Sequence, residues 1–154
     1  CSKKLILAGI IQDQGYYDQY IAPRIDNDKA VYIGSVGPDE RNRLLGRACA
    51  LLHPIQFDEP FGLSVIESMA CGTPVIAFDR GSMPELIENG KTGFLVGDGD
   101  DAVEAFARIK EIDRATCRRH VERHFTVERM VNEYIQVYEM ILDAGGLESG
   151  LQKL

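Results

Sequence analysis

Two carboxylates, Glu59 and Glu67, are separated by seven residues, and the run Pro-Phe-Gly-Leu directly follows the first of them. This pattern predicts a helix that begins at Gly62, with Glu59 in the loop before it and Glu67 in its first turns. The unpaired N–H groups and partial positive charge of a helix N-terminus favour phosphate. Carboxylates accept hydrogen bonds from sugar hydroxyls. The residues therefore predict a site for a sugar joined to a phosphate.

The elements that must position these residues alternate along the chain. Strands are predicted at 4–9, 31–34, 49–53, 74–78 and 93–96, and helices at 16–24, 38–47, 62–71 and 84–89. Strands that alternate with helices at this spacing indicate βαβ units and a parallel sheet covered on both faces. From Asp100 onward the pattern is helical, and a late helix carries one apolar face between Val127 and Leu142. Residues 144–154 are predicted to form a flexible tail.

Ligands of an open parallel sheet bind beyond the carboxyl ends of its strands. The loops at that edge are expected to start at Gly9, Gly34, His53 and Phe78. The third of these loops leads into Glu59. The candidate site is therefore predicted to lie where this class of fold holds its ligands.

Composition excludes several classes of partner. The chain has 154 residues, a formal net charge of −7 and a pI of about 5.0. An acidic chain disfavours nonspecific binding to nucleic acid or to an acidic membrane, because both need basic patches. No apolar run approaches the length of a membrane span. We therefore expect no nucleic-acid partner and no direct membrane contact.

The four cysteines form no Cys-x-x-Cys pair. Cys49 and Cys71 stand in apolar runs and are predicted to be small core residues. Widely spaced cysteines of this kind favour a reduced, cytoplasmic protein.

Several ordered motifs, taken together, resemble one family. They are EPFGLSVIE at 59–67, MACGTPV at 69–75, GSMPE at 81–85 and NGKTGFLV at 89–96. Over residues 4–142 the chain resembles the C-terminal, donor-binding domain of a GT-B-fold retaining glycosyltransferase of family 4, the group 1 type. The resemblance implies a Rossmann-like parallel sheet flanked by helices and followed by C-terminal helices. It also implies hexosyl transfer from a nucleotide-diphosphate sugar, the donor substrate.

The same resemblance implies a role for each matching residue. Glu67 would accept hydrogen bonds from the ribose hydroxyls of the nucleotide, and Glu59 would be the catalytic carboxylate that contacts the transferred sugar. Backbone N–H groups of Phe61, Gly62 and Leu63 would hold the sugar or the diphosphate. Transfer in this family proceeds with retention at the anomeric carbon and usually without a bound metal. The resemblance therefore implies no metal and no cofactor.

Three further residues are expected near the nucleotide base. They are Gly9 and two residues of the turn at 34–36, Gly34 and Val36. All three follow predicted strands of the first part of the chain.

The chain also departs from the family pattern. Members normally begin this domain with a Gly-Arg…Lys-Gly element whose cations neutralise the diphosphate, and residues 1–143 lack that first βα unit. The acceptor is expected to bind a missing N-terminal domain. We therefore expect the chain alone to bind donor weakly and to transfer nothing.

Other interpretations remain beside this one. A non-catalytic nucleotide- or sugar-binding module of the same fold is the alternative function. Gly81 and Ser82 either line the sugar pocket or merely form a turn. His53 is interpreted as a satisfied structural histidine. His120 and His124 stand four apart on a helix, but no third ligand accompanies them, so no metal site is predicted.

Overall fold

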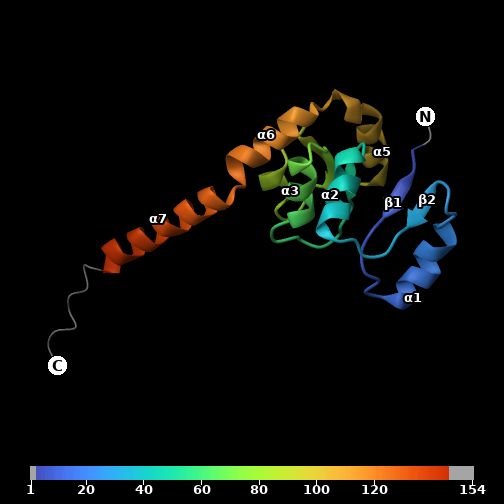
Figure 1. Ribbon diagram of the computed structural model, residues 1–154, viewed down its shortest axis with the longest axis horizontal. Coiled ribbons are helices and arrows are strands. Elements are labelled where there is room, and N and C mark those ends of the chain that lie inside the picture. Colours follow the sequence, from blue (N-terminus) through green and yellow to red (C-terminus); the bar gives the residue numbers. More distant parts are fainter. Residues whose placement is uncertain (1–2, 146–154) are drawn as a thin grey trace. The chain divides into compact units, whose positions relative to one another are not determined.

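The computed structural model describes residues 3–145 as an α/β chain (Figure 1). Its strands are β1 (Leu5–Leu7), β2 (Ala30–Tyr32), β3 (Leu51–His53), β4 (Val75–Phe78) and β5 (Gly93–Val96). Its α-helices are α1 (Gln14–Tyr16), α2 (Pro38–Arg47), α3 (Leu63–Ala70), α4 (Met83–Leu86), α5 (Gly99–Arg108), α6 (Arg114–His124) and α7 (Val127–Gly145). Every predicted strand and helix has a counterpart within a few residues.

Contacts divide the chain into two compact units, unit 1 (Cys1–Leu44) and unit 2 (Leu45–Leu154). The expectation of one donor-binding domain over 1–143 stays a prediction. Of the predicted tail at 144–154, the first two residues belong to α7, and residues 146–154 lie outside the described part of the chain.

Unit 1 contains a parallel pair of strands, with Leu5 opposite Ala30 and Leu7 opposite Tyr32. The segment between them is helical, as predicted for 16–24, but it changes type along its length. One turn of α1 is followed by a π-helical turn at Tyr17–Ile21 and a 3-10 turn at Ala22–Arg24. Pro23 has no N–H to donate, so a regular α-helix cannot continue through it.

Unit 2 contains a three-stranded parallel sheet in the order β3-β4-β5. The central strand β4 is the most buried: Val75, Ile76 and Ala77 are at most 2% exposed. A continuous apolar run is typical of a parallel strand covered on both faces. From α3, Val65 and Met69 are completely buried in the same core. The burial of these side chains is the main contribution to the stability of unit 2.

The helix boundaries follow local signals. Pro38 opens α2 as predicted, and Asp39 and Glu40 lie in its first turn, where negative charge is favourable. After α3 the chain turns through Gly72, which has a φ of +70°. That left-handed conformation suits glycine, which was expected to close this helix.

Two surface features differ from what local sequence suggests. Cys49 was predicted to be a core residue but is exposed, because it lies in the turn before β3 rather than in the strand; Cys71 is half-buried. The predicted apolar face of α7 is solvent-exposed, with Tyr134 57% and Leu142 72% accessible. None of the helices in residues 3–145 is both long enough and apolar enough to cross a membrane.

Candidate functional site

The candidate site lies on two loops that leave the same edge of the unit 2 sheet. The segment 54–62, called here the Glu59 loop, connects β3 to α3, and the segment 79–82 connects β4 to α4. Strands β3 and β4 are parallel neighbours, with His53 opposite Ala77. Both loops therefore begin at carboxyl ends, the edge predicted to bind ligands.

The carboxylate of Glu59 faces the beginning of α3. Its Oε1 accepts hydrogen bonds from the backbone N–H of Phe61 at 3.4 Å and of Gly62 at 3.3 Å. These distances are long for N–H···O bonds, so the two contacts are weak. Glu59 thus covers two of the N–H groups that the family resemblance assigns to the sugar or the diphosphate.

Gly62 is the N-cap of α3 and has φ +86° and ψ +52°. A Cβ at this position would come within 2.7 Å of Met83 Cε and 2.9 Å of Leu86 Cδ1. Glycine is therefore required by the left-handed backbone and by close packing against α4. That the N–H of Gly62 holds the sugar or the diphosphate stays a prediction.

The remaining predicted site residues of unit 2 lie on α3 or beside it. The side chains of Phe61 and Leu63 are 52% and 65% exposed, so neither belongs to the core. Glu67 is half-buried in the second turn of α3. The structure places Glu59, Phe61, Gly62 and Leu63 in one continuous turn and Glu67 one helical turn further on.

The loop 79–82 packs on the Glu59 loop. Ser82 donates its backbone N–H to the carbonyl of Glu59 at 2.9 Å and its hydroxyl to the carbonyl of Phe61 at 3.0 Å. Arg80 donates from Nη1 to the carbonyl of Gln56. Of the two interpretations left open for Gly81 and Ser82, the structure shows a turn whose hydroxyl bonds to the neighbouring loop.

The predicted base-binding residues belong to unit 1. The N–H of Gly9 donates to the carbonyl of Gly34 at 2.9 Å, and the hydroxyl of Tyr32 donates to the carbonyl of Gly9 at 2.7 Å. Gly9 therefore lies beside Gly34 at the carboxyl ends of β1 and β2. A cavity of about 370 Å³ adjoins Gly9 and is lined by apolar and aromatic side chains, among them Ile10, Tyr16 and Tyr17. Val36, half-buried, stands in the loop before α2.

His53 differs from the prediction. It ends β3, and its Nε2 atom is buried without a hydrogen-bond partner among the described residues, so it is not a satisfied structural histidine. Burial lowers the pKa of the imidazole, and the charge of Glu59 acts in the opposite direction. Sequence reasoning missed this because nothing local shows which partners the ring will find.

His120 is engaged within the fold. Its Nδ1 lies 3.2 Å from Glu88 Oε1, and its Nε2 lies 3.0 Å from the carbonyl of Leu86. The ring therefore ties α6 to the end of α4. Within residues 3–145, no group of three or more metal-ligating side chains is brought together.

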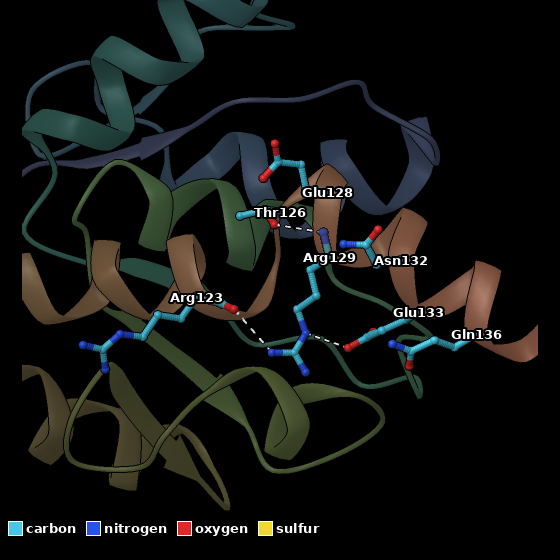
Figure 2. A pocket seen from close by; sticks show the side chains of 7 residues that line it. All are labelled: Arg123, Thr126, Glu128, Arg129, Asn132, Glu133 and Gln136. Carbon is cyan, nitrogen blue, oxygen red and sulfur yellow. Dashed lines mark hydrogen bonds and ion pairs between the residues drawn. The ribbon is translucent and has the colours of Figure 1, made fainter.

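The larger cavity, of about 420 Å³, lies where α6 meets α7 (Figure 2). Its lining is entirely polar or charged: Arg123, Thr126, Glu128, Arg129, Asn132, Glu133 and Gln136. Figure 2 shows the guanidinium of Arg129 between Glu133 and the carbonyl of Arg123, to both of which it bonds. The sequence analysis did not single out this cavity, and none of the predicted site residues lines it.

Comparisons with known proteins agree with the geometry. The family described as "Glycosyl transferases group 1" matches residues 2–124. A probable sucrose-phosphate synthase of Thermosipho melanesiensis is 39% identical over 85 residues, which are 53% of this chain and 20% of that protein. AviGT4, a glycosyltransferase involved in avilamycin A biosynthesis, has a TM-score of 0.75 and 28% identity over 93% of this chain and 44% of its own.

HepE of Anabaena, solved in complex with UDP, has a TM-score of 0.76 at 22% identity, which shows likeness of fold alone. That likeness covers 90% of this chain and 41% of HepE. The predicted fold class is confirmed by these structures. The chain spans less than half the length of each of the three proteins.

Proposed function

This chain belongs to the group 1 glycosyl transferases, and from that premise we propose that it is the donor-binding part of an enzyme that transfers a sugar from a nucleotide-diphosphate sugar with retention of anomeric configuration. The observation that carries the proposal is the Glu59 loop, where a carboxylate and the N–H groups of Phe61 and Gly62 converge at the start of α3. The acceptor would be bound by another part of the whole protein, and transfer requires both.

The geometry suggests how donor binding proceeds. The weak bonds of Glu59 to Phe61 N and Gly62 N would be exchanged for bonds from those N–H groups to the sugar or the diphosphate. The carboxylate would then accept hydrogen bonds from sugar hydroxyls, while Glu67 would accept them from the ribose. All of these groups lie within one loop and one helical turn of unit 2.

The same groups would assist the reaction. When the bond between the anomeric carbon and the phosphate oxygen breaks, the electron pair leaves with the nucleoside diphosphate. The nucleophilic atom of the acceptor forms the new bond to the anomeric carbon and gives up its proton. The N-terminus of α3 stabilises negative charge that develops on this leaving group. Backbone N–H groups would thereby supply positive potential, so the proposed reaction needs no metal. A cytoplasmic location is proposed with it.

Calorimetric titration of the chain with UDP, GDP and ADP tests donor binding. UDP is included because HepE, of the same fold, was solved with it. We expect saturable binding of one nucleotide and a loss of about tenfold or more in affinity for Glu67→Ala, since a hydrogen bond to a charged group contributes roughly 1.5–3 kcal/mol. Glu104→Ala, on the exposed face of α5, is the control and should bind like the wild type. Failure of all three nucleotides to bind would contradict the proposal for this chain.

The alternative is a non-catalytic module that binds a nucleotide or sugar through the same fold. A transfer assay on the whole protein, with Glu59→Gln as the inactive reference, separates the two functions. Transfer that depends on Glu59 supports the enzyme, whereas nucleotide binding without transfer supports the module.

A further inference from the structure

Ser82 donates two hydrogen bonds to the Glu59 loop. Its N–H donates to the Glu59 carbonyl at 2.9 Å, and its hydroxyl donates to the Phe61 carbonyl at 3.0 Å. The two acceptors lie on either side of Pro60, which has no N–H of its own. Ser82 is 8% exposed, and its hydroxyl is engaged by the Phe61 carbonyl.

The turn beneath this contact has no room for a side chain at Gly81. Gly81 has a φ of +55°, and a Cβ there would lie 2.6 Å from Glu59 N and 2.7 Å from Glu59 O. The backbones of the two loops are therefore in direct contact. The backbone of Glu59 is therefore held in place by the 79–82 turn as well as by the end of β3.

The hydrogen bond from the Ser82 hydroxyl to the Phe61 carbonyl also orients the N–H of Gly62. The Phe61 carbonyl and the Gly62 N–H belong to one planar trans peptide, so they point in opposite directions. A hydroxyl that holds the carbonyl therefore aims the N–H the other way, toward Glu59 Oε1, which accepts it at 3.3 Å. Because glycine can adopt many φ values, the Phe61–Gly62 peptide needs a contact from another segment to fix its orientation.

We propose that Ser82 is a positioning residue, which acts through the Phe61–Gly62 peptide to aim the Gly62 N–H at the sugar and diphosphate of the donor. The inference rests on the proposed function for its ligand, but the orientation of the peptide is a property of the free chain. Bonding of the carbonyl also polarises the peptide and strengthens its N–H as a donor. Ser82 does not itself touch the donor.

The test compares Ser82→Ala with a second buried serine in the same unit. Ser68 is fully buried and donates its hydroxyl to the Thr73 carbonyl at 3.1 Å, away from the Glu59 loop. Both substitutions remove one buried hydroxyl-to-carbonyl bond, so both should lower thermal stability by comparable amounts. Ser82→Thr keeps a hydroxyl and serves as the rescue variant.

Two measurements are made on the wild type and the three variants. The first is the affinity for UDP-glucose, GDP-glucose and ADP-glucose by calorimetry. The second is the position of the Gly62 amide resonance in the ligand-free chain by nuclear magnetic resonance. We expect Ser82→Ala to weaken donor binding by about tenfold, the equivalent of one lost hydrogen bond, and to shift the Gly62 resonance. Ser68→Ala should change neither, and Ser82→Thr should restore both.

The outcomes separate this inference from the proposed function. Equal donor affinity for Ser82→Ala and wild type, or an equal loss for Ser68→Ala, would overturn the positioning role and leave donor binding in place. If the wild type binds no donor, the proposed function fails, and with it the part of the inference that concerns the ligand. An unmoved Gly62 resonance in Ser82→Ala would overturn the remaining part.

Discussion

The two units of the chain differ most in what they bury. In unit 2, Val75 and Met69 are completely buried around a three-stranded sheet. In unit 1, Leu5 and Ile6 of the two-stranded sheet are each 46% exposed, and no residue between 3 and 44 falls in the buried class. A two-stranded sheet is marginally stable by itself. The Glu59 loop of unit 2 is therefore supported by a packed core, whereas Gly9 of unit 1 is not.

The largest effect of this difference in packing is expected from a substitution that adds a methyl group inside the unit 2 sheet. A Cβ at Gly93 would lie 2.2 Å from the carbonyl oxygen of Val75, in the neighbouring strand. We expect Gly93→Ala to destabilise unit 2 by about 4 kcal/mol or more, because the backbone of β4 would have to move. Urea unfolding followed by far-ultraviolet circular dichroism measures the loss.

Gly15→Ala in unit 1 is the matched control for that substitution. Its Cβ would meet only Asp13 Oδ1 at 3.4 Å, and Gly15 lies in α1, where alanine is favoured over glycine. It should leave the unfolding of unit 2 unchanged. A comparable loss for both variants would contradict the idea that the units differ in packing.

Truncation of one apolar side chain in each unit should give a smaller difference of the same sign. Met69→Ala removes a fully buried side chain, and we expect a cost of about 2–5 kcal/mol. Ile6→Ala removes a half-exposed one and should cost less than about 1 kcal/mol. Peptide-resolved hydrogen exchange would show faster exchange of β4 in the first variant. If Ile6→Ala accelerated exchange of β4 equally, the two units would form one cooperative core.

Alkaline pH should weaken unit 2 through its buried thiol. Burial is the main cause that raises the pKa of Cys117 from 9.0 to about 11. Between these values the unfolded chain has lost the proton that the folded chain keeps, so stability falls as pH rises through this window. The expected loss is on the order of 1–2 kcal/mol.

The contribution of Cys117 is measured against Cys117→Ala, since tyrosines and lysines titrate in the same range. The unfolding free energy of the variant should fall less steeply between pH 9 and pH 11. Parallel curves for the two proteins would show that the thiol does not carry the dependence. Residues 3–44 contain no cysteine, so this part of unit 1 should show no such contribution.

Removal of a helix cap should give the smallest difference in stability between the two units. Asp98 Oδ1 accepts from the N–H groups of Asp100 and Asp101, both at 2.9 Å, at the start of α5. Its replacement by alanine should cost unit 2 about 1 kcal/mol. Asp13 caps the short α1 of unit 1 through Tyr16 N at 2.8 Å. Asp13→Ala should leave the urea midpoint of unit 2 unchanged. An equal shift of this midpoint for Asp13→Ala and Asp98→Ala would argue that the two units do not differ in packing.

Local sequence was sufficient to predict the elements and the residues of the Glu59 loop. Pro38 at the start of α2 and Gly72 after α3 act on backbone conformation within a few residues, so their effects are visible in the chain itself. Glu59 and Gly62 are three residues apart, and any turn that begins a helix at this point brings them together. The family motifs added the roles, which the proposed experiments test.

What only the tertiary structure decided involves contacts between residues distant in sequence. The bond from Ser82 to the Phe61 carbonyl spans 21 residues, and the packing of Gly62 depends on Met83 and Leu86 across the same gap. The Nε2 of His53, which is buried with no hydrogen-bond partner in residues 3–145, likewise depends on what surrounds the end of β3. Sequence determined the order of strands and helices and the residues of the Glu59 loop, because propensity and capping are local. Folding determined which side chains hold that loop, because a hydrogen bond between two loops exists only once parallel strands place their ends side by side.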